Sequence, residues 1–163
     1  MIRELREEDV PACLRIYNHY IKSTCFTLEE DPLSLEEFGG RIRRIKSKYP
    51  FIVKENEEGE IVGYAYLDLF HERSAYRKTV DLSIYVDKSH LHEGMGKELL
   101  SNIEDSAKER GFRNIVSIVT SENPNSLDFH LRNGFLLEGT LHDIAFKMGK
   151  RIDTYYLRKP LAD

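Results

Sequence analysis

The sequence contains only two cysteines, Cys13 and Cys25, and no tryptophan. Neither cysteine belongs to a Cys-x-x-Cys pair or lies near a cluster of histidines, which argues against a disulfide framework and against a zinc site. The apolar runs are too short to span a membrane, and the start of the chain, MIRELREEDV, lacks the apolar core of a secretory signal. We therefore expect a cytoplasmic protein with no bound metal and no membrane partner.

A strong excess of charge is also absent, because 24 Lys and Arg residues against 28 Asp and Glu leave a net charge of -4. This slightly acidic balance, together with the lack of a basic helix, argues against a nucleic-acid partner. The chain has 163 residues, of which 40% are hydrophobic, so it can bury a core without disulfides or metals. With no linker, repeat or low-complexity segment, we expect residues 1–163 to form a single domain.

The most informative stretch runs from Val80 to Leu100 and reads VDLSIYVDKSHLHEGMGKELL. Its first seven residues alternate between apolar and more polar side chains, which is the period of a strand with one apolar face. A polar loop follows. Apolar residues then recur every four positions, which predicts a helix with one buried stripe, formed by Met95, Leu99, Ile103 and Ala107.

Gly94 and Gly96 stand where this loop enters the helix. A strand that leads through a glycine-bearing loop into a helix directs several backbone N–H groups at one point, and the helix dipole favours negative charge there. This arrangement is typical of a phosphate-binding loop. Two glycines two positions apart also occur in ordinary tight turns, so both interpretations stay open at this point.

The rest of the chain predicts a mixed α/β domain. Ser34 and Glu37 form a capping box at the start of one helix, and another helix starts after Asp9. Asn56 to Gly59 has the composition of a hairpin turn, so the sheet should begin antiparallel. Strands are expected over 2–5, 51–54, 61–69, 115–120, 135–141 and 152–157, with a turn at 147–150 and a short helix over 126–133.

Short motifs spread over nearly the whole chain carry a family resemblance. They are Ile16-Tyr17-Asn18-His19, Ser23-Thr24 with Phe26, Gly63-Tyr64-Ala65, Phe70 with Arg73 and Tyr76, Thr79-Val80-Asp81, Ser83-Ile84-Tyr85-Val86, Glu122-Asn123 with Ser126, His130, Gly134-Phe135, and Lys147-Met148-Gly149 with Asp153. Together and in this order they resemble the GNAT superfamily of acetyl-CoA-dependent N-acetyltransferases, and more narrowly its phosphinothricin acetyltransferase-like branch.

The resemblance implies the GNAT fold, an α/β architecture whose mixed, mostly antiparallel central sheet has a splayed pair of parallel strands and is flanked by helices. Acetyl-CoA would lie against the splayed pair, and its pyrophosphate would be held by the loop that opens the central helix. The cofactor-binding residues that this implies are Tyr85, Val86, Leu91, His92, Glu93, Gly94, Met95, Gly96, Lys97, Asn123 and Ser126.

This loop departs from the family's pattern at three positions. Leu91 stands where the family usually has Arg or Gln, and His92 and Glu93 stand where Gly or Arg is frequent. Because most of such a site is backbone amide, we expect the cofactor to be retained. Plainer interpretations are a solvated helix residue for Lys97, a turn residue for Asn123 and a helix cap for Ser126.

The implied reaction moves an acetyl group from a thioester to an amine, which must lose a proton before it attacks. The branch places an acidic base, usually Glu, directly after Thr-Val, and here that residue is Asp81. Since Asp is one methylene shorter, we expect the proton to pass through a water molecule. Tyr85 or His130 would protonate the leaving thiolate, and backbone N–H groups at Tyr85 to Asp87 would polarise the thioester carbonyl.

For the acceptor, the resembled branch implies a pocket lined by Phe26, Phe70, Arg73, Tyr76 and Thr79. The planar guanidinium of Arg73 suits the carboxylate of an amino-acid-like substrate. The plainer interpretation is that Arg73 is an exposed surface charge. The implied acceptors are small-molecule amines such as phosphinothricin, methionine sulfoximine and methionine sulfone. The branch also implies a homodimer, which the aromatic strand around Tyr155 and Tyr156 could support.

Two alternatives remain open from the sequence. The first keeps acetyl-CoA but transfers the acetyl group to a protein or peptide amine, although an aromatic lid over the acceptor would disfavour it. The second is a CoA-binding module that has lost catalysis, which is suggested by Leu91, Glu93 and the shorter acid Asp81. Binding of acetyl-CoA without turnover of any amine would identify it.

Overall fold

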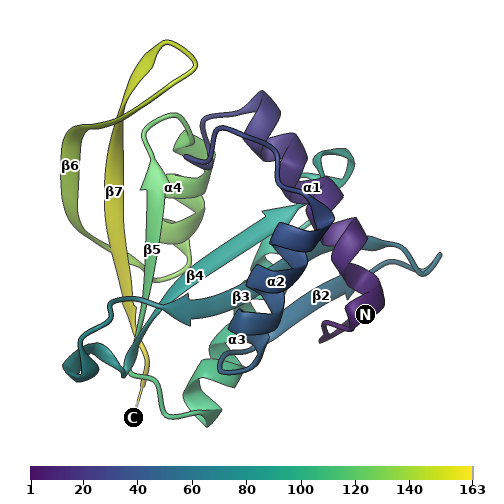
Figure 1. The fold of residues 1–163 in the computed structure, drawn as a ribbon. Coiled ribbons are helices and arrows are strands. Elements are labelled where there is room, and N and C mark those ends of the chain that lie inside the picture. Colours follow the sequence, from purple (N-terminus) through teal and green to yellow (C-terminus); the bar gives the residue numbers. More distant parts are fainter. Residues whose placement is uncertain (163) are drawn as a thin grey trace.

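The computed structural model describes residues 1–162, and within them one seven-stranded sheet carries the fold. Figure 1 shows its strands and the helices that flank them. The elements are β1 (Ile2–Glu4), α1 (Val10–Ser23), α2 (Leu35–Lys46), β2 (Phe51–Glu55), β3 (Ile61–Leu69), β4 (Thr79–Val86), α3 (Met95–Glu109), β5 (Asn114–Thr120), α4 (Pro124–Arg132), β6 (Leu136–Lys147) and β7 (Lys150–Pro160).

The strands lie in the order β1-β2-β3-β4-β5-β7-β6. Every neighbouring pair is antiparallel except β4 and β5, which run parallel. This matches the expected fold class, a mostly antiparallel mixed sheet with one parallel pair. Among residues 1–162, no helix combines the length and the apolar character that a membrane crossing requires.

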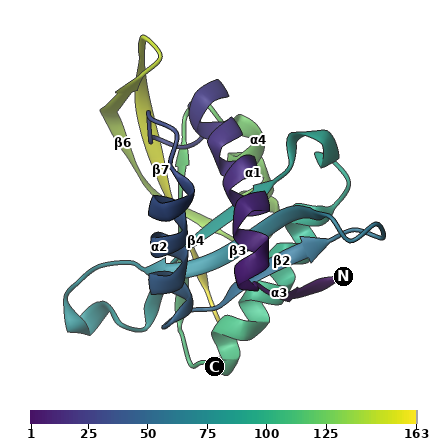
Figure 2. The same cartoon turned by 45° about the vertical axis from the view of Figure 1, so that its right-hand side comes forward.

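Helices cover the sheet on both faces. Figures 1 and 2 show α1 and α2 on one face of β2 to β4, and α3 on the opposite face. Each face has its own hydrophobic cluster: Tyr64 of β3 packs with α1 and α2, whereas Ala65 and Leu67 pack with α3. Alternate residues of one strand therefore serve both cores, as the two-residue period of a strand requires. The predicted stripe on α3 is confirmed at Leu99, Ile103 and Ala107, with Leu100 buried beside them, whereas Met95 is only half-buried.

The parallel pairing is short, and this creates an opening in the sheet. β4 and β5 are in register only from Thr79 opposite Asn114 to Asp81 opposite Val116. Beyond Asp81 the two strands diverge (Figure 1). Because a separated strand edge leaves backbone donors and acceptors without a neighbouring strand, the divergence exposes peptide groups to any ligand that enters.

Most local expectations are confirmed. The Ser34–Glu37 capping box is formed in both directions, and the Lys147–Lys150 turn has Met148 at φ 53° and Gly149 at φ 74°, as expected for a two-residue hairpin turn.

The predicted strands over 135–141 and 152–157 were too short, since β6 and β7 extend to the turn. The pairing of β6 with β7 is irregular between Leu141 and Ala145, where Asp143 has a φ of 52°. This β-bulge interrupts the alternation of apolar and polar residues by which a strand is predicted from the sequence.

Candidate active site

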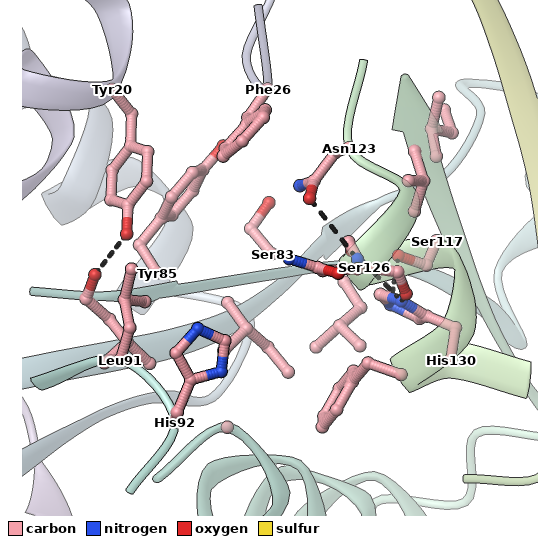
Figure 3. Close-up of a pocket in the computed structure, with 18 residues that line it drawn as sticks. Tyr20, Phe26, Ser83, Tyr85, Leu91, His92, Ser117, Asn123, Ser126 and His130 are labelled. Carbon is pink, nitrogen blue, oxygen red and sulfur yellow. Dashed lines mark hydrogen bonds between the residues drawn. The ribbon is translucent and has the colours of Figure 1, made fainter. Parts of the chain in front are cut away.

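A pocket of about 300 Å³ occupies the opening between β4 and β5. It is shown in Figure 3, where side chains from both strands, from the start of α3 and from α4 face one space. The lining residues come from five segments and comprise Tyr20 and Phe26, Leu82 to Val86, Leu91 with His92 and Gly96, Ser117 to Val119, and Asn123, Asn125, Ser126, Phe129 and His130.

The backbone of β4 presents one side to this pocket. The Asp87 N–H donates to the carbonyl of Val62 at 2.8 Å, so it is committed to β3 and is not available for a carbonyl in the opening, contrary to expectation. Because bonding direction alternates along an antiparallel strand, the Tyr85 N–H also faces β3 and the Val86 N–H faces the opening. The Val86 carbonyl, on the same side, accepts a hydrogen bond from the Tyr20 hydroxyl (Figure 3). Val86 is therefore the peptide group that can meet a ligand.

The loop between β4 and α3 forms one end of the pocket. His92 and Gly94 have φ values of 67° and 80°, and this left-handed backbone turns the chain sharply into α3 at Met95. A Cβ on Gly94 would meet no atom within 4 Å, so the backbone there is openly accessible. The N-terminal N–H groups of a 15-residue helix thus lie beside the pocket, and their dipole favours a phosphate group.

Side chains of this loop are placed differently from one another. Leu91 and His92 line the pocket, as does Gly96, which faces the ring of Phe129. The Glu93 carboxylate lies 3.3 Å from Nδ1 of His90 and outside the lining, so the acidic side chain is held by a neighbour instead of facing the site. Met95 and Lys97 also lie outside it, and Lys97 is exposed. The loop can therefore bind an anionic group mainly through its backbone N–H groups and less through charged side chains.

His130 is buried in the wall formed by α4 and β5. Its Nδ1 lies 2.7 Å from the Ser126 carbonyl and its Nε2 lies 2.8 Å from Oγ of Ser117. Because a carbonyl only accepts, Nδ1 carries the hydrogen and Nε2 accepts from the Ser117 hydroxyl. Burial lowers the pKa of His130, so the imidazole is neutral at neutral pH. Both ring nitrogens are therefore engaged within the protein.

Asn123 begins α4. Its side-chain oxygen accepts from the Ser126 N–H at 3.3 Å, and Pro124 occupies the first turn. Asn123 is thus the helix cap, and the plainer interpretation of Ser126 as the cap was wrong. The predicted helix start at Ser126 is also too late, since α4 begins at Pro124. Both Asn123 and Ser126 nevertheless line the pocket.

Asp81 lies at the closed base of the opening, at the last paired position of β4 and β5. It is not among the lining residues, but it directly precedes Leu82 and shares a strand face with Ser83, which do line the pocket. Burial, and then the charge of Asp68 on β3, raise the pKa of Asp81 to about 7. A carboxyl group with this pKa can accept a proton at neutral pH.

Tyr85 points into a cluster of aromatic rings under α1. Its ring centroid lies 5.1 Å from that of Tyr17 and 5.5 Å from those of Tyr20 and Tyr64. Burial raises the pKa of Tyr85 well above its ordinary value, so its phenol keeps its proton. Figure 3 shows Tyr85, Tyr20 and Phe26 on the same side of the pocket.

The structure brings only one of the five predicted acceptor residues into the pocket lining. Phe26 lines it and is 39% exposed, whereas Phe70, Arg73, Tyr76 and Thr79 do not line it. Phe70 and Tyr76 pack on each other in the loop that precedes β4, with centroids 5.7 Å apart. Arg73 is exposed in the same loop, and its backbone N–H lies 3.4 Å from Nδ1 of His71. A closed aromatic lid is therefore not assembled over this pocket.

The segment that carries Phe26 is tied to β5 and β6. The Thr120 hydroxyl donates to the Cys25 carbonyl at 2.7 Å, and Nζ of Lys147 donates to the Thr27 carbonyl at 2.8 Å. Lys147 is only 3% exposed, and burial lowers its pKa. These contacts connect the acceptor side of the pocket to the C-terminal hairpin.

Sequence reasoning did not identify Tyr20 or Ser117 as lining residues, or Lys147 as a support of the segment that carries Phe26. Lys147 stood in one of the quoted motifs, which was the only signal for it. Tyr20 and Ser117 carry no local signal, because they reach the site through packing. Within residues 1–162, no three His, Cys, Asp or Glu side chains are grouped so that they could hold a metal ion.

Comparisons with known proteins give matches over nearly the whole chain. The family model described as "Acetyltransferase (GNAT) domain" matches residues 2–156. A solved structure titled as a GNAT superfamily phosphinothricin acetyltransferase from Sinorhizobium meliloti in complex with AcCoA is similar, with a TM-score of 0.96 and 32% identity over 99% of this chain and 88% of that one.

Two further proteins are similar to this chain over nearly its whole length. The L-methionine sulfoximine/L-methionine sulfone acetyltransferase of Pseudomonas paraeruginosa is 29% identical over 96% of this chain and 92% of its own length. A structure titled ribosomal-protein-alanine N-acetyltransferase from Brucella melitensis has a TM-score of 0.94 and 31% identity, and covers 99% of each chain.

Proposed function

The chain belongs to the GNAT acetyltransferase family, and from this premise we propose that it transfers the acetyl group of acetyl-CoA directly to the amino group of a small amino-acid-like substrate. The observation that carries this proposal is the opening between β4 and β5. It joins a helix N-terminus suited to phosphate, a peptide group at Val86 and a carboxyl group at Asp81 whose pKa is about 7.

Acetyl-CoA supplies the activated carbonyl. In our proposal the backbone of residues 91–96 holds its pyrophosphate, Lys97 adds charge from the first turn of α3, and Asn123 and Ser126 contact its pantetheine arm. The Val86 N–H donates to the thioester oxygen as negative charge develops there, since a fixed donor costs no reorganisation during the reaction. Leu91 removes one side-chain donor that the family usually provides, and the backbone amides compensate for it.

Asp81 removes the proton from the acceptor amine in this mechanism. Since Asp81 lies behind the pocket lining, the proton of the amine reaches it through a bridging water molecule in this mechanism. Such a base is worth about 10² to 10⁴ in rate. Of the two acids named from the sequence, Tyr85 keeps its proton and can donate a hydrogen bond to the thiolate, whereas His130 would first have to release its 2.7 Å bond to Ser126.

The acceptor class is supported by two of the similar proteins, which are named for phosphinothricin and for methionine sulfoximine or sulfone. We propose that Phe26 contacts the acceptor directly and that Arg73, with Phe70, Tyr76 and Thr79, borders the acceptor entrance. The exposed guanidinium of Arg73 is free to bind a substrate carboxylate.

The test is thiol release from acetyl-CoA with phosphinothricin, methionine sulfone, polyamines and a peptide with a free N-terminus as acceptors. We expect turnover of the amino-acid analogues and a large loss of it in Arg73→Ala. Arg77→Ala, in the same exposed loop, is the matched control and should keep its turnover. Turnover that survives in Arg73→Ala would remove Arg73 from the acceptor site.

A second candidate is a protein or peptide N-acetyltransferase. It is favoured by the similarity to an enzyme named for ribosomal-protein alanine and by the absence of Phe70 and Tyr76 from the pocket lining. Turnover of the peptide alone would select this candidate. Tight binding of acetyl-CoA with no turnover of any acceptor would instead indicate a CoA-binding module.

We also propose a homodimer that buries exposed apolar side chains of the C-terminal hairpin. Large apolar side chains 45–65% exposed gather on β6 and its turn, namely Leu136, Leu137, Leu141, Ile144, Phe146 and Met148. Tyr155 and Tyr156 of the neighbouring strand are half-buried and contribute less than expected. A concentration of exposed apolar side chains on one hairpin supports an interaction site there.

Sedimentation at micromolar concentration, with and without acetyl-CoA, tests the dimer. Phe146→Glu should yield monomers, whereas Leu35→Glu, a similarly exposed apolar position on α2, should not change the oligomeric state. A wild-type monomer would refute the proposal. A single catalytic domain over 1–163 and a cytoplasmic location also remain proposals, to be checked by limited proteolysis and by cell fractionation.

A further inference from the structure

We infer that Asp68 and Arg44 are positioning residues for the catalytic base: Asp68 places a second carboxylate directly opposite Asp81 on the neighbouring strand, and Arg44 offsets part of its charge. The inference rests on the proposed role of Asp81. It concerns two residues outside the pocket lining, one on β3 and one on α2.

The geometry starts from the register of β3 and β4. Asp68 and Asp81 are directly opposite each other in this antiparallel pair. Opposite residues share a face of the sheet, with Cβ atoms about 5 Å apart, and like charges at this distance repel. The same strand pairing that places Asp81 at the base of the opening therefore places a second carboxylate beside it.

Asp68 has a hydrogen-bond partner and an ion-pair partner of its own. Its Oδ1 accepts the Leu69 N–H at 2.7 Å, and its two oxygens lie 3.4 Å from Nη1 and Nη2 of Arg44. Arg44 is 60% exposed and Asp68 is 22% exposed, so the ion pair is partly screened by water. Arg44 therefore offsets part of the negative charge of Asp68.

Asp81 has no such compensation among residues 1–162, since no cation there forms an ion pair with it. On β3 the other titratable neighbour is Tyr66, a phenol whose pKa burial raises, so it is neutral. On α2 the second guanidinium, Arg41, is bound to Glu29. On β5 the opposite residue is the apolar Val116. Asp68 is therefore the charge that acts on Asp81.

The consequence is a base suited to neutral pH. A carboxylate with an ordinary pKa would be a weak acceptor for the proton of an amine, whereas one that binds its proton more strongly is a better base once it is ionised. Burial raises the pKa of Asp81 first, and the like charge of Asp68 on the adjacent strand adds to it. The shorter Asp at this position thus keeps a base strength suited to the reaction.

The pH dependence of kcat/KM for thiol release provides the test, measured on the full chain. Asp68→Asn should move the acidic limb to lower pH by about 0.5 to 2 pH units, the range that a unit charge about 6 Å away produces between water-like and protein-like screening. Arg44→Gln should move the limb in the opposite direction by a smaller amount. Arg43→Gln, on the same helix but bound to Glu7, is the control and should leave the limb in place.

A limb that stays unmoved in Asp68→Asn, or moves to higher pH, would overturn the inference. If Asp68→Asn fails to fold, Arg44→Gln carries the test because its side chain is exposed, and an unmoved limb there would equally overturn it. Asp81→Asn separates this failure from that of the proposed mechanism. A limb that persists in Asp81→Asn refutes Asp81 as the base, whereas its loss there, with no shift in Asp68→Asn, refutes only the tuning.

Discussion

Asp81→Asn should stabilise the folded protein at neutral and alkaline pH while it removes the catalytic base. Burial and Asp68 raise the pKa of Asp81 from 3.8 to about 7. The folded state therefore binds this proton more tightly than the unfolded state does, and the free energy of unfolding falls as the pH rises from about 4 to about 7. Asn resembles the protonated acid and does not titrate, so the variant escapes this loss.

The magnitude follows from the pKa. The difference of about 3 pH units, at 1.36 kcal/mol per unit, sets an upper bound of about 4 kcal/mol above pH 7. Partial access of water to Asp81 reduces it, so we expect a gain of about 2 kcal/mol at pH 8. For a chain of this size this corresponds to a rise in Tm of roughly 4–8 °C.

Urea unfolding of the wild type and Asp81→Asn at pH 5 and pH 8 measures this gain. The difference in unfolding free energy between the two proteins should widen by about 1–3 kcal/mol from pH 5 to pH 8. Asp105→Asn, an exposed position on α3, controls for the loss of one negative charge and should show no such widening. A constant or shrinking difference for Asp81→Asn would mean that Asp81 is not held in a protonated form near neutral pH, and the reasoning would fail.

Two further predictions concern the rims of the pocket. Lys147→Met should raise the KM for the acceptor several-fold and leave the KM for acetyl-CoA unchanged, because it frees the segment that carries Phe26. Lys150→Met breaks only an exposed ion pair with Glu122 and should change neither KM. Equal effects of the two variants would contradict this prediction. Gly94→Ala should cost about 1–2 kcal/mol of stability and weaken acetyl-CoA binding, because its φ is 80°. Gly40→Ala, in α2 with no atom near the added Cβ, should instead stabilise by about 0.5–1 kcal/mol, and a loss at Gly40 comparable to that at Gly94 would show that backbone conformation is not the cause.

The local elements could be predicted from the sequence because each depends on residues close together in the chain. The alternation from Val80 to Val86 requires only the two-residue period of a strand, and the capping box at Ser34 requires only a side chain three residues away. The strand, loop and helix from Val80 to Leu100 could therefore be predicted from this stretch alone, with a phosphate-binding loop as one of two open interpretations. The family resemblance added Asp81, Asn123 and His130 as candidates.

Where those candidates lie was decided by pairing between distant segments. The divergence of β4 from β5 after Asp81 sets the pocket, and the register of β3 with β4 places Asp68 against Asp81. The hydrogen bonds of His130 and Lys147 likewise join elements that are separate in the chain. Sequence periodicity indicates which face of a strand or helix a residue occupies. It does not indicate which strand lies opposite or where two strands separate. Only the tertiary structure determined the electrostatic environment of the base and the shape of the opening.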